Sequence, residues 1–169
     1  FKHIKIPLKH TSASLKYSSW NLKGSVLVTD TYINLRWETD IENKASGIIV
    51  GADQGLKTVV TLSDEQTTIP KNIHGHSLES IIENMCKKKP GSRAFKRAQE
   101  HRKNFINWSI NQLNLDNIKQ VKLEKVVNIT YKKQTSKKLK HWSNSEIRNK
   151  LISRCELLGG PSSFTIFSL

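Results

Sequence analysis

The sequence has few cysteines, few acidic residues and no long apolar run, and each shortage excludes a class of protein. Its two cysteines, Cys86 and Cys155, form no CxxC pair, so zinc is not expected to be bound by this chain and both thiols are expected to be reduced. No apolar run approaches the roughly 18 residues that span a bilayer, and the start lacks the apolar segment of a signal peptide. We therefore expect a cytoplasmic protein with no membrane partner. The start also lacks Met, which indicates a piece of a longer protein or a processed product.

The shortage of acidic residues gives the chain a large positive charge. Its 169 residues include 28 Lys and Arg against 14 Asp and Glu, a formal net charge of +14 at pH 7. Such an excess favours a polyanionic partner, of which nucleic acid is the simplest. An anionic membrane surface is the competing interpretation. It is disfavoured because no helical pattern pairs a lysine face with a bulky apolar face.

Residues 1–46 have the pattern of a small β unit. Two runs rich in β-formers, "SVLVTD" and "TYINLRWETD", are joined by the turn residues 29–31, and the second run alternates apolar and polar positions over 33–37. The polar segment 41–47 ends in Gly and indicates a boundary. We therefore expect one domain over 1–46 and a second over 47–169.

The second domain changes from strand to helical periodicity along its length. The expected elements are strands over 47–53, 56–64 and, more weakly, 66–75, helices over 77–89 and 92–113, a strand over 118–126, a basic loop over 125–140, a helix over 143–158 and a last strand over 162–169. Ser92 is the expected N-cap of the long helix, and Ser143 with Glu146 forms the pattern of a capping box. The order of strands and helices predicts an α/β fold of the ribonuclease H-like class, with a mixed sheet and flanking helices.

An aspartate ends the most apolar strand of this domain and invites two interpretations. In "GIIVGADQGLKTVVTLSD" (47–64), Asp53 stands between glycines at the end of an apolar run. Asp and Gly are ordinary turn residues, so the segment can be a simple chain reversal. A carboxylate at a strand end can also bind a metal ion, since burying its charge without a partner is costly. On the residues alone both interpretations stay open.

Four segments together resemble the nuclease part of one family. "GIIVGADQGLKTVVTLSD" (47–64) is similar to the first RuvC motif, "KKKPGSRAFKRAQEHRKNF" (87–105) to a basic segment that opens a long helix, and "VKLEKVVNI" (121–129) to the second RuvC motif. "HWSNSEIRNKLISRCELLGG" (141–160) resembles a segment in which a Trp precedes a helix that ends in Gly. In this order and spacing they resemble transposon-encoded TnpB (OrfB) proteins and the related type V CRISPR effectors. "IKIPLKH" (4–10) is similar to the wedge-like β domain upstream.

The resemblance implies both a site and partners. It implies a RuvC-like nuclease domain over 47–169, incomplete at its C-terminus, after the end of a wedge-like domain over 1–46. Guide RNA and target DNA are the implied partners, together with the remainder of a longer protein encoded in a prokaryote or mobile element. Asp53 and Glu124, placed on neighbouring strands of that fold, are the implied catalytic residues and metal ligands. Two Mg²⁺ or Mn²⁺ ions about 3.5–4 Å apart would there support phosphodiester hydrolysis.

Two departures from the family pattern bear on activity. Lys125 follows Glu124 where the family has Asp, and no Asp occurs after Asp116 to supply the third acidic residue. We therefore expect the chain alone to bind nucleic acid but to cleave it poorly or not at all. Two alternatives stay open, a nuclease-dead RNA-guided DNA-binding relative and another ribonuclease H-like resolvase or integrase.

Basic side chains on the long helix and the basic loop are the expected nucleic-acid contacts, because Lys and Arg neutralise phosphates without reading sequence. The candidates are Lys57, Arg93, Lys96, Arg97, Arg102, Lys103, Lys132, Lys133, Lys137, Lys138 and Lys140.

Several other residues allow a functional and a structural interpretation. Tyr131 and Trp142 can stack on unpaired bases, although Trp142 serves equally well as a core anchor. We interpret Asp64 as a turn cap and Glu156 as a surface residue, and both are weaker candidates for a third metal ligand. His74 and His76 are interpreted as part of a solvent-facing loop and not as a metal pair.

Overall fold

The structure is a computed structural model, and it describes residues 12–15, 17–123 and 136–159. The chain divides into two units, residues 1–40 and 41–169, which are described separately. Among the described residues, no helix has the length and apolar character needed to cross a membrane.

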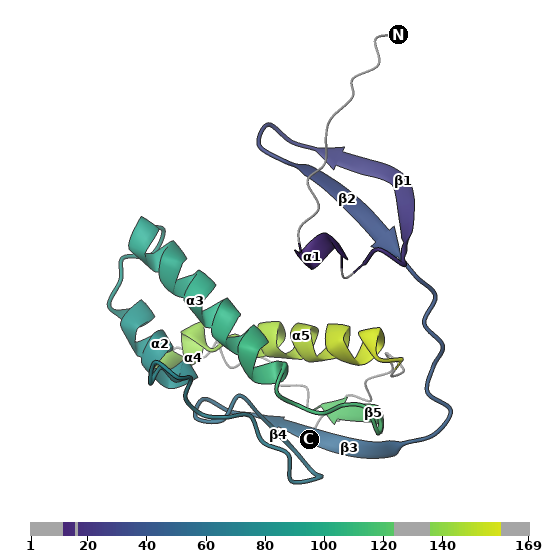
Figure 1. The fold of residues 1–169 in the computed structure, drawn as a ribbon. Helices are drawn as coiled ribbons and strands as arrows, with labels where there is room; N and C mark the ends of the chain where they lie inside the picture. Colours follow the sequence, from purple (N-terminus) through teal and green to yellow (C-terminus); the bar gives the residue numbers. More distant parts are fainter. Residues whose placement is uncertain (1–11, 16, 124–135, 160–169) are drawn as a thin grey trace. The chain divides into compact units, whose positions relative to one another are not determined.

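The first unit contains a short helix and a β-hairpin (Figure 1). Helix α1 (Ser12–Leu15) precedes strands β1 (Asn21–Val28) and β2 (Ile33–Glu38), which pair antiparallel. The predicted turn at 29–31 is confirmed. The Thr29 hydroxyl accepts hydrogen bonds from the backbone N–H groups of Thr31 and Tyr32, at 3.4 and 3.1 Å. The predicted alternation of β2 is also present, with every second residue half-buried.

The described part of the second unit contains a mixed sheet of three strands in the order β4-β3-β5, and the last strand expected over 162–169 lies outside the described residues. The central strand β3 (Ile48–Gln54) pairs antiparallel with β4 (Val60–Leu62) and parallel with β5 (Ile118–Leu123). This arrangement confirms the α/β class and the mixed sheet expected from the sequence.

The third strand expected over 66–75 is not formed. Only an isolated bridge joins Thr61 to Thr67 there. The buried Thr68 side chain explains why: its hydroxyl accepts from the Val60 N–H at 3.1 Å and lies 3.3 Å from the Val60 carbonyl oxygen. Beyond it, the Ile69 N–H donates to the Gln112 side chain, so the backbone leaves the sheet toward the helices.

Between and after these strands, the described residues form three longer helices and one short helix: α2 (Leu78–Cys86), α3 (Arg93–Ile110), α4 (Lys137–His141) and α5 (Asn144–Leu157). The expected cap of α3 is confirmed, because the Ser92 hydroxyl accepts from the Phe95 N–H at 3.1 Å. Helix α2 begins with a capping box between Ser77 and Ser80.

The capping box expected at the start of α5 is not made. Ser143 occupies the N-cap position, but its side chain accepts no capping hydrogen bond. The Glu146 carboxylate that would complete the box instead lies 3.3 Å from the Arg102 guanidinium of α3. The ion pair between the two helices replaces the local cap.

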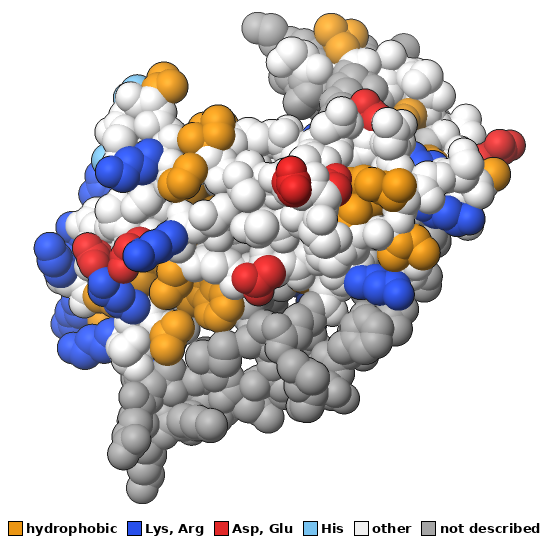
Figure 2. Space-filling view, turned by 90° about the horizontal axis from the view of Figure 1, so that it is seen from below, with side chains coloured by type: hydrophobic (Ala, Val, Ile, Leu, Met, Phe, Trp, Pro, Cys, Tyr) orange, Lys and Arg blue, Asp and Glu red, His pale blue; other side chains and the backbone are white. Residues whose placement is uncertain are grey.

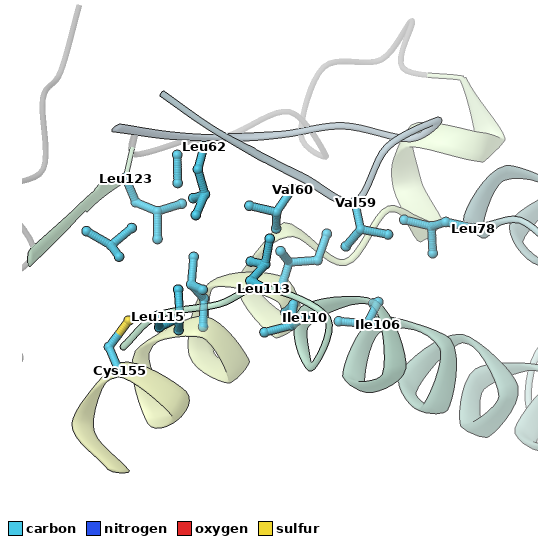
Figure 3. Packing of buried hydrophobic residues seen from close by; sticks show 14 of the residues in the cluster. Val59, Val60, Leu62, Leu78, Ile106, Ile110, Leu113, Leu115, Leu123 and Cys155 are labelled. Carbon is cyan, nitrogen blue, oxygen red and sulfur yellow. The ribbon is translucent and has the colours of Figure 1, made fainter. Parts of the chain in front are cut away.

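The core lies between one face of the sheet and helices α3 and α5 (Figures 1 and 3). Strand residues that point inward meet helix residues at helical spacing, as the sequence pattern predicts. The buried set includes Val50, Leu62, Val121 and Leu123 from the strands, Ile106 and Ile110 from α3, and Ile147, Leu151 and Cys155 from α5. Burying each large aliphatic side chain contributes about 1.5–3 kcal/mol, so this layer fixes the sheet against the helices.

The segment 41–46 packs with the second unit, although the sequence pattern places it with the first. Lys44 Nζ donates to the carbonyl oxygens of Leu115, Asp116 and Ile118, at 2.6, 2.7 and 3.1 Å. The Lys44 N–H donates to the Gly159 carbonyl at 2.7 Å. A lysine ammonium can satisfy three acceptors at once, and composition alone does not reveal such a use.

Candidate metal and nucleic-acid site

Asp53 lies in strand β3 and points away from the core. Along β3, Val50 and Ala52 are buried while Gly51 and Asp53 are exposed, so Asp53 lies on the face opposite α3 and α5. The turn begins after it, where the Gly55 N–H donates to the Val59 carbonyl at 3.3 Å. A Cβ on Gly55 would lie 2.8 Å from the Thr58 carbonyl oxygen, so the turn requires glycine there. The apolar strand therefore carries Asp53 without burying its charge, and the turn is a separate feature.

A shallow hollow surrounds Asp53 on this face of the sheet. It is lined by residues of all three strands, namely Gly51, Ala52, Asp53, Thr61, Leu62, Ser63, Lys122 and Leu123. The Ser63 hydroxyl accepts from the Gly51 N–H at 2.9 Å and so ties β3 to the end of β4. Because Gly51 has no side chain, the space beside Asp53 on this face stays open.

Strand β5 runs beside β3 in the same direction, and Leu123 is the Cα partner of Ala52. Glu124 follows Leu123 in the sequence but lies outside the described residues. The predicted pairing of the Asp53 and Glu124 carboxylates therefore stays a prediction. Among the described residues, no group of three or more His, Cys, Asp or Glu side chains is arranged to hold a metal ion.

The weaker acidic and histidine candidates occupy the places that the sequence indicated. Asp64 accepts from the Gln66 side-chain amide at 2.7 Å and from the Gln66 N–H at 3.3 Å, so it caps a turn. Glu156 is exposed on α5. His74 and His76 are exposed in the loop before α2.

The predicted nucleic-acid contacts divide into exposed cations and cations engaged within the protein. The exposed ones are Lys57, Arg93, Lys96, Arg97, Lys103, Lys137 and Lys140, while Lys132 and Lys133 lie outside the described residues. In Figure 2, Lys and Arg side chains gather at the end of the unit where Figure 1 shows α2 and α4, with acidic side chains among them, and further acidic side chains lie nearer the centre of that face.

Two of the predicted cations, Arg102 and Lys138, have partners within the protein. Arg102 donates to the His141 carbonyl at 2.7 Å in addition to its ion pair with Glu146. Lys138 lies 3.2 Å from Glu79 and also pairs with Glu83. Hydrogen bonding to Lys138 lowers the pKa of Glu83, and the same bond raises the pKa of Lys138. Both groups are solvent-exposed, so this pair contributes little to stability.

The expected basic loop is in part a helix. Residues 124–135 lie outside the described residues, but 137–141 form α4, capped by the Ser136 hydroxyl at 3.3 Å from the Leu139 N–H. The prediction of a loop over 125–140 therefore does not describe its last residues, which the ion pairs of Lys138 hold against α2. Trp142, just after α4, packs against the core and is an anchor, as one of its two interpretations held. Tyr131 lies outside the described residues.

A polar groove between α3 and α5 was missed by the sequence reasoning. It is lined by Arg102, Lys103, Asn107, Ser143, Ser145, Glu146, Asn149, Lys150 and Ser153. Ser145, Asn149 and Ser153 follow one another at four-residue spacing, which places small polar side chains in a row on one face of α5. That row is the signal of this groove in the sequence.

Comparisons with known proteins add no identification. No protein-family model matches the chain, and no curated protein matches it.

Proposed function

We propose that the second unit is the RuvC-like part of an RNA-guided DNA endonuclease of TnpB type. Its substrate is a DNA strand selected by pairing with guide RNA, and its reaction is metal-dependent phosphodiester hydrolysis. The observation that carries the proposal is the position of Asp53 on the outward face of the central strand, beside the parallel strand that Glu124 follows in sequence. The strand order β4-β3-β5 also agrees with a ribonuclease H-like fold.

The donor set around Asp53 fits a hard divalent cation. The hollow offers the Asp53 carboxylate and the hydroxyls of Thr61 and Ser63, which are all oxygen donors. Mg²⁺ and Mn²⁺ prefer such ligands and keep several of their waters. Asp53 would hold the ion directly, and Glu124 would complete the ligand pair. When bound, the metal lowers the pKa of a coordinated water and stabilises the leaving oxygen.

The chain's own residues would position the nucleic acid. Exposed Lys and Arg side chains on α3 and α4 would neutralise backbone phosphates, and they lie in the same unit as the hollow. The amide and hydroxyl groups of the α3–α5 groove would add hydrogen bonds to phosphate oxygens. Such contacts fix the position of a strand without reading its sequence, as an RNA-guided protein requires.

The metal site is tested by titrating the whole chain with Mn²⁺ and following free Mn²⁺ by electron paramagnetic resonance. We expect Asp53→Asn and Glu124→Gln to weaken binding at least tenfold. The matched control Asp64→Asn should leave it unchanged, because Asp64 bonds to Gln66. Unaltered binding by Asp53→Asn would remove the active-site argument.

Cleavage is tested separately with single-stranded DNA and Mg²⁺ or Mn²⁺. We expect salt-dependent binding and little or no cleavage by the isolated chain, because the third acidic ligand expected for a two-metal site was not found in its sequence. Robust cleavage that disappears in Asp53→Ala would contradict this expectation of inactivity and show that the ligand set is complete. Binding of guide RNA and DNA with no metal binding at Asp53 would favour the nuclease-dead relative, and cleavage of branched DNA without guide RNA would favour a resolvase.

A further inference from the structure

A second hollow lies on α3 on the flank opposite the α3–α5 groove. It is lined by Asn72, Ile73 and His74 from the loop before α2 and by His101, Asn104 and Trp108 from α3, with the buried ring of Phe105 also lining it. His101, Asn104 and Trp108 share one helix flank because they lie at i, i+3 and i+7. Residues 103 and 107, which line the groove, lie on the other flank. The hollow therefore combines aromatic rings, two carboxamides and one aliphatic side chain.

The loop that forms one wall of the hollow is held by its own hydrogen bonds. The Asn72 carboxamide oxygen accepts from the N–H groups of His74 and His76, both at 3.0 Å. The Asn72 N–H donates to the His76 carbonyl, and the Gly75 N–H donates to the Asn72 carbonyl, both at 2.9 Å. Gly75 adopts a φ of +74°, which glycine reaches without strain.

This loop presents Ile73 to solvent almost completely. Ile73 is 94% exposed, far more than the other exposed isoleucines of this unit such as Ile69 at 55%. The hydrogen bonds of Asn72 hold the backbone on both sides of Ile73, so the loop would have to break them to turn Ile73 toward the protein. A single exposed aliphatic side chain is ordinary on a protein surface, so Ile73 bears on binding only because it lines this hollow together with the rings of α3.

The rings in and beside the hollow are arranged for stacking. Trp108 is half-buried and its ring lies 5.3 Å from that of Phe105, so it is supported from below. The ring of His101 meets that of His76 edge to face at 5.0 Å. Burial and the neighbouring His76 lower the pKa of His101, which keeps its ring neutral at pH 7. Neutral, supported rings offer flat faces to a planar ligand.

The charges around the hollow indicate which planar ligand fits. Arg97 is exposed on the same flank of α3, at i−4 from His101. Lys71 is exposed at the start of the loop. A base with a phosphate on either side combines a flat ring with adjoining negative charge, and the exposed Asn104 carboxamide can both donate to and accept from a base edge.

We propose that this hollow holds one unpaired nucleobase of a bound strand. The base stacks on the Trp108 and histidine rings, Ile73 packs against it, and Arg97 and Lys71 neutralise the adjoining phosphates. The inference rests on the nucleic-acid binding of the proposed function, and it is independent of the metal site at Asp53.

The test compares two single-stranded oligonucleotides with the same phosphates, one of thymidines and one with abasic residues in its central positions. Affinities are measured by fluorescence anisotropy with the whole chain, in EDTA and at several salt concentrations. We expect the thymidine strand to bind about fivefold or more tightly, because stacking of one base contributes that much. We also expect the thymidine strand, but not the abasic strand, to quench tryptophan fluorescence. Loss of this quenching in Trp108→Phe would assign the signal to Trp108.

Substitutions separate the hollow from the general charge. Ile73→Ser should reduce the preference for the thymidine strand at least threefold and leave the salt dependence unchanged. Its matched control, Ile69→Ser, removes an exposed isoleucine outside the hollow and should change nothing. Arg97→Gln should weaken both strands and reduce the salt slope by about one.

Each outcome decides between the two proposals. Salt-dependent binding with no preference for bases, or equal effects of Ile73→Ser and Ile69→Ser, would overturn the base site and leave the proposed function standing. An Ile73→Ser protein with wild-type binding to both strands would show that Ile73 does not contact a bound base, which also refutes the base site. Absence of binding to both strands would overturn both proposals.

Discussion

Replacing Lys44 by Met should loosen the junction between the segment 41–46 and strand β5. Methionine keeps most of the length and apolar stem of lysine but has no ammonium group. It therefore removes a charged donor from three carbonyl oxygens, those of Leu115, Asp116 and Ile118. The hydrogen bond from the Lys44 N–H to Gly159 does not depend on the side chain and should persist.

The size of the effect follows from which carbonyls can turn to water. A hydrogen bond to a charged donor contributes about 1.5–3 kcal/mol, and a buried acceptor that loses its partner costs about 1–3 kcal/mol. Asp116 is exposed, so its carbonyl can be hydrated, whereas Leu115 and Ile118 are buried residues. The Leu115 carbonyl still accepts from the Ile118 N–H at 3.1 Å, so we count only the Ile118 carbonyl. We expect Lys44→Met to reduce the free energy of unfolding of the second unit by about 1–3 kcal/mol.

Amide hydrogen exchange measured by mass spectrometry locates the loss. Peptides covering 115–123 should lose protection by roughly 5- to 150-fold, the factor that corresponds to the expected free energy. Lys119→Met is the matched control, because Lys119 Nζ makes one exposed bond to the Ala45 carbonyl, at 2.9 Å. It should lower the free energy of unfolding by less than about 1 kcal/mol. Equal losses in the two variants would refute the assignment of Lys44 as the principal link.

Three further predictions concern stability and thiol chemistry. Ser92→Ala should lower the free energy of unfolding by about 1 kcal/mol, because the substitution removes the α3 cap. Ser143→Ala should change the free energy of unfolding little, because the Ser143 side chain makes no capping bond. Urea unfolding measures both effects. Burial raises the pKa of Cys155 to about 11, so at pH 8 roughly one thiol in a thousand is ionised, and iodoacetamide should modify the half-buried Cys86 first. Faster labelling of Cys155 in the folded chain would contradict its burial. Burial also lowers the pKa of His101 below its unfolded value of 6.5. The contribution of His101 to stability is therefore complete above pH 6.5 and is lost as the pH falls below that value. His101→Asn should flatten the decline of the melting temperature between pH 7 and 5, and an unchanged decline would count against this assignment.

Much of the second unit could be predicted because its signals are local. The apolar run that forms β3, the serine that caps α3 and the four-residue spacing of Ile147, Leu151 and Cys155 each follow from residues close in sequence. Asp53 was found as a candidate for the same reason, since a carboxylate at the end of an apolar strand is unusual. Its orientation away from the core agrees with the period of two along a strand.

The failures share a different cause, which is competition from distant partners. Glu146 matches a capping box in sequence, but the guanidinium of Arg102 from another helix is the stronger partner. Thr68 fits a strand by propensity, yet its buried hydroxyl bonds the backbone of Val60 and ends the pairing. The contacts of Lys138 that help to form α4 come from α2, far along the chain. Such tertiary contacts have no local signature.

The pairing of β3 with β5 has a consequence for how the protein is made. Ile48 pairs with Ile118, 70 residues later, so the parallel half of the sheet closes a long loop that α2 and α3 occupy. The hairpin of β3 with β4 and the neighbouring helices α2 and α3 involve only local contacts and can form early. On the ribosome, the chain must therefore extend beyond residue 123, and through the exit tunnel, before β5 can reach β3. Until then the central strand exposes one unpaired edge and an apolar face, which makes this the interval in which the nascent chain is most prone to aggregate and to benefit from a chaperone.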